Sequence, residues 1–197
     1  PSNPLGVPLV LDINPTGQPA RNSAGEVMSQ IVSDLNDAKS LLPAVTASNF
    51  TDTLLNQVNI AAYQARIALY RKDYDAAVTY ASEVINSNVK PLADISSFPD
   101  IWVGASDAEV LFRRKYTGGG IGSLWSTSAG QILIAPSDKL VSSYSGSDVR
   151  LPVYIGTNGT NNYVNKFYGS SLGVGVVDAI VARTAEMYLI RAEAYAN

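Results

Sequence analysis

The chain has 197 residues, of which 46% are apolar and only 16% are charged. This length is enough for one domain with a sizeable core, or for two small domains. Lysine and arginine total 14, aspartate and glutamate total 17, and the net charge is -3. A mildly acidic chain gives no electrostatic reason to expect a nucleic-acid partner, so we expect a folded protein that binds no nucleic acid.

The sequence contains neither histidine nor cysteine. It therefore excludes every site that needs an imidazole, such as a Ser-His-Asp triad, and every site that needs a thiolate, such as an iron–sulfur cluster. The aspartates and glutamates show no pairing of the kind that a glycosidase needs across the scissile bond. The glycine-rich runs also lack the lysine of a phosphate-binding loop. We therefore expect a protein without catalytic activity, metal or cofactor.

The first 22 residues and the segment that follows them, as far as residue 43, have different sequence patterns. Residues 1–22 contain Pro4, Pro8, Pro15 and Pro19 in their interior, which predicts an extended lead-in. Ser23 and Glu26 then have the spacing of a capping box, in which the two side chains satisfy backbone N–H groups at a helix start. Apolar residues follow at helical spacing as far as Leu42, and Pro43 ends the predicted helix.

A helical hairpin is predicted over residues 56–88. Its first helix begins after Asn56 as N-cap and ends near Arg71, and its second begins near Tyr74. A connection this short makes the two helices antiparallel neighbours. The first helix carries small side chains that allow close packing, namely Ala61, Ala62, Ala65 and Ala68.

Residues 91–179 are rich in proline and glycine, which predicts loops with short strands. We place these strands at Glu109–Arg113, Val153–Ile155 and Tyr163–Tyr168. A final helix is predicted over residues 181–196. Its apolar face is expected to comprise Ala185, Tyr188, Leu189, Ala192 and Tyr195.

Two sets of motifs resemble known families. The segment from Ala61 to Ile85 resembles a tetratricopeptide repeat, with small residues at the helix crossing and an aromatic residue opening the second helix. A longer series of motifs resembles the SusD/RagB family, the surface glycan-binding lipoproteins of Bacteroidetes. The series comprises G-V-P-L-V (6–10), E-V-M-x-x-I-x-x-D-L-x-x-A-x-x-L-L-P (26–43), A-R-I-A-L-Y (65–70), D-Y-x-x-A (73–77), A-x-x-V-I (81–85), E-V-L-F (109–112), D-V-R (148–150), K-F (166–167) and R-T-A-E-M-Y-L-I-R-A-E-A-Y (183–195).

The resemblance implies a mainly α fold, in which tetratricopeptide-type hairpins carry a loop-rich region with short strands. It also implies a surface protein of the outer membrane that captures oligosaccharides and passes them to a TonB-dependent, SusC-like transporter. Family members are held at the membrane only by a lipid on an N-terminal cysteine, which this sequence lacks.

Family members are also much longer than 197 residues. We therefore expect a partial SusD-like domain, either a piece of a longer protein or a reduced member. The final helix of a repeat buries its apolar face against a partner helix. We expect that partner to lie outside this sequence or on another chain.

Glycan recognition needs flat aromatic faces and planar polar groups. The loop-rich region offers both, and our candidate carbohydrate-binding residues are Trp125, Tyr144, Tyr154, Arg114 and Asn161. Trp125 ranks first because it follows a glycine-rich run that leaves room for a projecting ring. The alternative is that these rings belong to the core, above all Trp102, which lies in an apolar stretch.

Two charged groups are interpreted as structural. Asp148 and Arg150 match the family's D-x-R element and are expected to fix a loop by an ion pair. Arg183 and Glu186, with Glu193, are expected to brace the last helix through contacts between residues three positions apart.

An alternative function is a tetratricopeptide-type module that binds a peptide or a partner protein. Such modules hold peptides in the groove of stacked hairpins. Aromatic side chains exposed in the loops would favour a glycan ligand, whereas polar residues lining the helical groove would favour a peptide. The alanines of the first hairpin helix fit a packed interface better than a groove, which favours the glycan.

Overall fold

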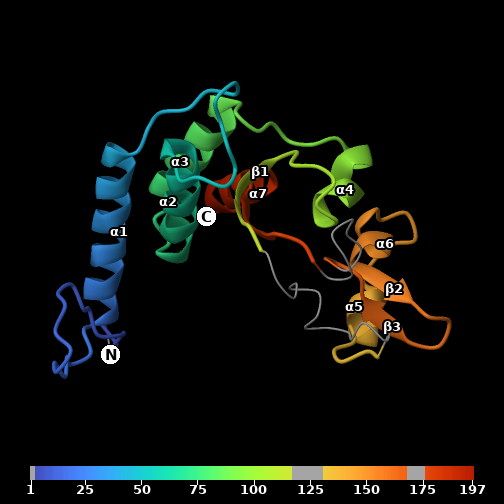
Figure 1. Cartoon of the computed structure of the whole chain (residues 1–197), viewed down its shortest axis with the longest axis horizontal. Coiled ribbons are helices and arrows are strands. Elements are labelled where there is room, and N and C mark those ends of the chain that lie inside the picture. Colours follow the sequence, from blue (N-terminus) through green and yellow to red (C-terminus); the bar gives the residue numbers. More distant parts are fainter. Residues whose placement is uncertain (1–2, 117–130, 168–175) are drawn as a thin grey trace.

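The computed structural model describes residues 3–116, 131–167 and 176–197. Within them the fold is mainly α with a few short strands, as the sequence predicts (Figure 1). Two regions stand apart in this view. The helical scaffold comprises α1, α2, α3 and α7 with strands β1 and β4, and the distal lobe comprises residues 131–167. No helix in the described ranges is long and apolar enough to cross a membrane.

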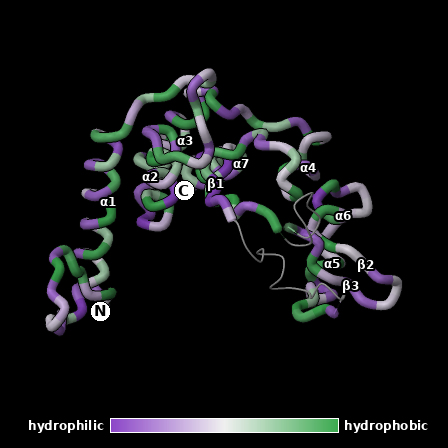
Figure 2. The backbone as a smooth tube through the Cα atoms, in the orientation of Figure 1, coloured by the Kyte–Doolittle hydropathy of each residue, from purple (hydrophilic) through white to green (hydrophobic). Residues whose placement is uncertain are grey.

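The lead-in and helix α1 (Ala24–Leu41) form one side of the scaffold. Ser23 and Glu26 form the predicted capping box, and the Ser23 N–H donates to Glu26 Oε2 over 2.8 Å. The lead-in folds back on itself, since the Gly6 N–H donates to the Asn22 carbonyl and Arg21 donates to two lead-in carbonyls. Figure 2 shows hydrophobic and hydrophilic positions alternating along α1. No residue of α1 is fully buried.

The predicted hairpin is present. Helix α2 (Gln57–Tyr70) starts at Asn56, whose side chain accepts from two N–H groups, while Asn59 Oδ1 accepts from the Asn56 N–H over 2.8 Å. Helix α3 (Tyr74–Ser87) follows after a turn in which Lys72 has a positive φ of 59°. Both helices bury alanines completely, and these small side chains let the two helices pack closely. The fully buried alanines are Ala61, Ala65, Ala77 and Ala81.

Helix α7 (Thr184–Tyr195) packs on this hairpin and completes the core. The apolar face predicted for α7 is the face that the hairpin leaves uncovered, whereas the residues facing the hairpin are Met187, Ile190 and Ala194. Leu189 is 71% exposed and Tyr195 is 72% exposed. Both stripes of the helix are apolar, and docking against α3 selects one of them.

The start of the final helix is also corrected. Residues Ala179–Arg183 form strand β4, which pairs antiparallel with β1 (Val110–Arg114), and the helix begins only at Thr184 rather than at Val181. The predicted strand at 109–113 is therefore present, shifted by one residue. The register of β1 with β4 is irregular around Phe112. Leu111 of β1 is 1% exposed and joins the helical core.

The remaining elements lie between the scaffold and the distal lobe or within it. The 3-10 turn Ile95–Ser97 leads into α4 (Phe98–Trp102), and the distal lobe contains α5 (Asp138–Ser142), α6 (Arg150–Tyr154), β2 (Ile155–Thr157) and β3 (Asn162–Val164). Strands β2 and β3 form a hairpin with Gly156 opposite Tyr163. A Cβ at Gly156 would come within 2.3 Å of the Tyr163 ring, so glycine permits this crossing.

The two predicted strands of this region are shorter than expected or displaced. The first includes only Ile155 of its predicted range, because residues 150–154 are helical. The second ends at Val164, and Tyr168 lies outside the described residues.

Candidate functional site

An aromatic joint connects α4 to the distal lobe. It consists of Phe98 and Trp102 from α4, Tyr154 from α6, and Phe167 after β3. The Trp102 ring centroid lies 5.9 Å from that of Phe98, 5.4 Å from that of Tyr154 and 5.3 Å from that of Phe167. The contacts are edge-to-face, the geometry that aromatic pairs favour. Trp102 is only 4% exposed, which confirms its interpretation as a core residue.

Two cations lie against this joint. Lys166 Nζ is 4.0 Å from the centroid of the Trp102 ring and 4.9 Å from that of Tyr154. The Arg183 guanidinium carbon is 4.7 Å from the Trp102 ring centroid. Burial lowers the pKa of Lys166, and the nearby positive charge of Arg183 lowers this pKa further. Arg183 forms an ion pair with Glu109, a side chain that is 4% exposed.

An open pocket of about 320 Å³ lies beside the joint. Its lining includes Trp102, Lys166 and Phe167, together with Glu186 and strand β4 as far as Arg183. The indole Nε1 of Trp102 is buried and has no hydrogen-bond partner among the described residues. This volume is near the lower end of the range of about 300–1,000 Å³ for small-molecule sites.

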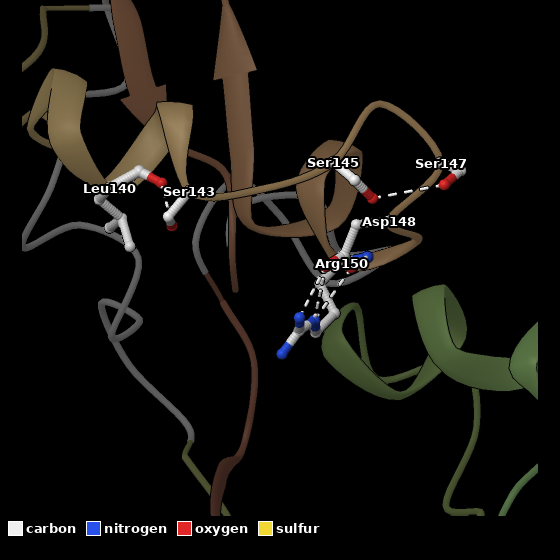
Figure 3. Close-up of polar contacts among 6 residues, drawn as sticks. All are labelled: Leu140, Ser143, Ser145, Ser147, Asp148 and Arg150. Atoms are coloured by element: carbon white, nitrogen blue, oxygen red, sulfur yellow. Dashed lines mark hydrogen bonds and ion pairs between the residues drawn. The ribbon is translucent and has the colours of Figure 1, made fainter.

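A polar platform in the distal lobe consists of Tyr144, Asp148 and Arg150. Figure 3 shows the Arg150 guanidinium facing the Asp148 carboxylate, and Arg150 Nη2 lies 2.6 Å from Asp148 Oδ2. The Arg150 N–H also donates to Asp148 Oδ1 over 2.9 Å, which closes the start of α6. Hydrogen bonding from Arg150 lowers the pKa of Asp148.

The platform presents a cation and a ring to solvent. The Arg150 guanidinium carbon is 5.6 Å from the centroid of the half-buried Tyr144 ring, and the Arg150 side chain remains 58% exposed. Tyr154 connects the platform to the aromatic joint, because it contacts Trp102 and is close enough to Tyr144 and Arg150 for both to influence its pKa. Burial raises the pKa of Tyr154.

The structure brings some of the predicted site residues together and separates others. Tyr144 and Tyr154 belong to the same lobe, with Asn161 in the exposed turn between β2 and β3, where its N–H donates to Asn158 Oδ1. Arg114 instead ends strand β1 in the scaffold and is exposed. Trp125 lies outside the described residues.

The predicted bracing of α7 is wrong in its partners. Arg183 pairs with Glu109 of the segment before β1, not with Glu186. Both carboxylate oxygens of Glu186 bind Arg66 of α2 at 2.6 Å, and Arg66 also donates to the Val181 carbonyl. The two carboxylates therefore connect α7 and β4 to segments far away in the sequence. Sequence spacing alone does not determine which elements face each other in the fold, so it did not predict these pairs.

Sequence reasoning missed three residues near the pocket. Phe98, Lys166 and Phe167 were not among the candidate binding residues, although Lys166 and Phe167 belong to the K-F motif. The signal available in the sequence was that Lys166 and Phe167, a cation and a ring, are neighbours in a loop-rich segment. That both lie close to Trp102, more than sixty positions earlier, could be seen only in the tertiary structure.

A second groove lies on the scaffold, between the α2–α3 turn and α7. It has a volume of about 470 Å³, and its lining includes Tyr70, Tyr74, Leu189 and Glu193. Tyr70 and Leu189 are each 71% exposed. The groove therefore includes Leu189, one of the apolar side chains of α7 that the hairpin leaves uncovered.

Comparison with known proteins reveals similarity in structure. No protein-family profile and no curated protein sequence matches the chain. A SusD superfamily protein from Bacteroides thetaiotaomicron VPI-5482 matches 97% of this chain and 47% of its own, with a TM-score of 0.80 and 24% identity. Surface glycan-binding protein A from Bacteroides uniformis matches 95% of this chain and 49% of its own, with a TM-score of 0.77 and 18% identity.

A laminarin-binding SusD-like protein matches 98% of this chain and 55% of its own, with a TM-score of 0.75 and 19% identity. The chain thus spans about half the length of the solved structures that it matches. The SusD-like resemblance predicted from the sequence is confirmed as a shared fold over nearly the whole chain.

Proposed function

We propose that this chain is part of a non-catalytic cell-surface protein that binds oligosaccharides and delivers them to a TonB-dependent outer-membrane transporter. The observation that carries the proposal is the shared fold. Of the solved structures that match nearly the entire chain, one is a surface glycan-binding protein and another a laminarin-binding protein. Because fold alone does not determine function, the site residues must also suit a glycan.

The distal lobe has the chemistry that a sugar needs. Tyr144 offers a half-buried ring, and Arg150 offers donors that are already oriented by Asp148. A guanidinium held in place loses little conformational freedom when a ligand hydroxyl binds. The exposed turn with Asn161 adds amide groups on the same lobe. These features support glycan binding by the distal lobe.

The same residues give no support to catalysis. Asp148 forms an ion pair with Arg150. Glu109 forms one with Arg183, and Glu186 forms one with Arg66. A glycosidase needs one carboxyl group that holds a proton and a second that faces the sugar. These three carboxylates form ion pairs instead, two of them between distant segments and one within a single turn.

Binding of the full-length protein to a panel of immobilised glycans tests the proposal. We expect at least one glycan to bind, and Tyr144→Ala to weaken that binding about tenfold or more, as removal of a stacking ring does. Tyr70→Ala, which truncates an exposed ring on the scaffold, is the matched control and should leave binding unchanged. Loss of binding in both variants, or in neither, would remove Tyr144 from the site. Absence of binding to every glycan would refute the proposed function.

Delivery to a transporter is tested separately. We expect the full-length protein, purified from outer membranes in mild detergent, to bring a TonB-dependent transporter with it. Purification without any such transporter, under conditions in which glycan binding is retained, would limit the function to capture.

The scaffold groove favours one alternative, a module that binds a peptide. The alanines of α2 do not line it, since Ala61 and Ala65 are completely buried. Tyr70 and Leu189 do line it and are exposed. Peptide binding that Tyr70→Ala abolishes and Tyr144→Ala preserves would favour this alternative over glycan capture.

A further inference from the structure

The turn between β2 and β3 carries the only Asn-Gly pair of the sequence, Asn158 and Gly159. We propose that Asn158 is a site of spontaneous deamidation, at which the backbone nitrogen of Gly159 displaces the side-chain nitrogen of Asn158 as ammonia. This inference goes beyond the proposed function and does not depend on glycan binding. It starts from the position of the turn, in which residues 157–161 are all exposed to water.

The shape of the turn requires glycine at position 159. Gly159 has a φ of 90°, a conformation that residues with side chains rarely adopt. A Cβ at this position would meet nothing within 4 Å, so the space around the residue is open. The turn therefore needs the one residue type that leaves its own peptide nitrogen without a side chain to shield it.

The side chain of Asn158 is held with its carbonyl group polarised. Its Oδ1 accepts from the Asn161 N–H over 2.9 Å and from the Thr160 N–H over 3.2 Å. An atom that accepts from two N–H groups must be the oxygen of the amide, which fixes the orientation of the side chain. Attack at Cγ places negative charge on this oxygen, and N–H groups directed at such an oxygen stabilise that charge. The turn therefore favours attack on Asn158 Cγ.

The attacking atom is the backbone nitrogen of Gly159. Its N–H donates to Thr157 Oγ1 over 3.1 Å rather than to a backbone carbonyl of the β2–β3 pair. Thr157 is exposed, and exposed side chains change rotamer rapidly. A rotation of the Thr157 side chain therefore gives water access to the Gly159 N–H.

The reaction balances with solvent water as the only co-reactant. The Gly159 nitrogen forms a bond to Asn158 Cγ and gives its proton to water or hydroxide. The bond between Cγ and Nδ2 breaks, and the nitrogen leaves with a proton as ammonia. Water then adds to either carbonyl of the resulting succinimide, and the ring opens to aspartate or isoaspartate. Both products carry a negative charge that Asn158 lacks.

The two products differ in what they do to the turn. Aspartate keeps an oxygen that accepts from the N–H groups of Thr160 and Asn161, with a charge that strengthens both bonds. Isoaspartate carries the main chain through Cβ and Cγ, which lengthens the turn and displaces the acceptor. The isoaspartate form therefore changes the backbone that positions Asn161.

The other asparagines of the chain lack this combination. Asn3 and Asn14 precede prolines, which have no N–H to lose. Asn161 is exposed in the same turn, but the side chain of Asn162 crowds the next peptide nitrogen, so Asn161 is the internal control. Three more lie inside helices, where the next N–H takes part in helical hydrogen bonding, namely Asn36, Asn59 and Asn86.

Ageing of the folded full-length protein in heavy-oxygen water tests the inference. The protein is incubated at physiological temperature and mildly alkaline pH and is then digested in ordinary water for mass spectrometry. Deamidation during the incubation incorporates heavy oxygen, whereas deamidation during digestion does not. Enzymatic methylation of isoaspartate is the second readout. A peptide of residues 155–164 is the unstructured reference, since an isolated hairpin is barely stable in water.

We expect Asn158 in the folded protein to deamidate at a rate within about tenfold of the peptide, and at least about tenfold faster than Asn161. Isoaspartate should be methylated at position 158. Asn158→Gln should show no conversion there, because glutamine would have to close a larger ring, and thermal unfolding shows that this variant is folded.

The other outcomes overturn the inference. Conversion of the peptide without conversion of the folded protein would show that the turn protects the amide. Equal rates at Asn158 and Asn161 would assign the reaction to exposure alone. Deamidation that carries only ordinary oxygen would be a product of the digestion. None of these results bears on the proposed function, which the glycan panel tests separately.

Discussion

The helical scaffold and the distal lobe differ in how completely their side chains are buried. The scaffold buries alanines, Leu111 and Met187 almost completely, in a core shared by α2, α3, α7 and the β1–β4 pair. In the distal lobe, by contrast, no described residue is fully buried, and the rings of Tyr144, Tyr154 and Tyr163 are all half-buried. The scaffold therefore gains its stability from packing, whereas the lobe leaves its rings and the Arg150 donors partly exposed.

The ion pairs differ in the same way. Arg183 and Glu109 connect segments more than seventy positions apart, and the Glu109 side chain is 4% exposed. Asp148 and Arg150 are two positions apart, and the Arg150 side chain is 58% exposed. The first pair determines how distant elements meet, and the second shapes one local turn.

The strongest test of this comparison removes one arginine from each pair. Arg183→Met leaves the Glu109 carboxylate buried without its partner, and we expect the free energy of unfolding to fall by about 3–5 kcal/mol. Arg150→Met should change it little, because solvent screens the exposed pair. Urea denaturation of both variants measures the difference. Similar losses in the two would contradict the distinction between the regions.

Truncation within α7 tests which face of that helix is buried. Met187→Ala empties a site that is 0% exposed, so we expect a loss of about 2–5 kcal/mol. Leu189→Ala, on the opposite stripe of the same helix, removes a side chain that is 71% exposed and should have little effect on stability. A larger loss of stability for Leu189→Ala than for Met187→Ala would mean that another segment covers the Leu189 stripe.

Overpacking tests how closely the hairpin helices approach. Ala65→Leu adds volume at a position of α2 that is completely buried, and we expect a loss of about 1–3 kcal/mol. Ala192→Leu, at an exposed position of α7, is the control and should be nearly neutral. Thermal unfolding midpoints measure both changes. An unchanged unfolding midpoint for Ala65→Leu would show that α2 has room for a larger side chain where it packs in the core.

The smallest expected effect is the pH dependence of stability that Asp107 contributes. A hydrogen bond from Lys90 lowers the pKa of Asp107 below its usual value of 3.8. A carboxyl with a lowered folded-state pKa stabilises the fold above its unfolded pKa and loses that contribution as the pH falls through the folded value. The stability difference between wild type and Asp107→Asn should therefore be present at neutral pH and shrink below a pH of about 4. Urea denaturation across this range measures it, and a difference that grows on acidification would contradict the assignment.

The helices of the scaffold could be predicted because their signals are local. Ser23 with Glu26, and Asn56 before the alanine-rich run, specify helix starts through contacts within one turn. The SusD-like resemblance was also carried by motifs in the sequence, and the shared fold confirms it. The aromatic candidates were found by residue type. Tyr144 and Tyr154 proved to lie within one lobe close to Arg150, and Trp125 lies outside the described residues.

The elements that sequence reasoning missed depend on partners far along the chain. Residues 179–183 have helix-forming neighbours, yet they are extended because β1 offers its backbone groups to them. The stripe of α7 that is buried was decided by α3, since both stripes are apolar.

By itself, the sequence determined where α1, α2 and α3 begin and end, and that the chain lacks imidazole and thiol chemistry, because these depend on residue type and on neighbours within a turn. Only the tertiary structure decided that Lys166, Arg183 and Trp102 share one pocket and that Glu186 pairs with Arg66. Those contacts join segments many tens of residues apart, and their formation depends on how whole elements pack rather than on the spacing of any motif.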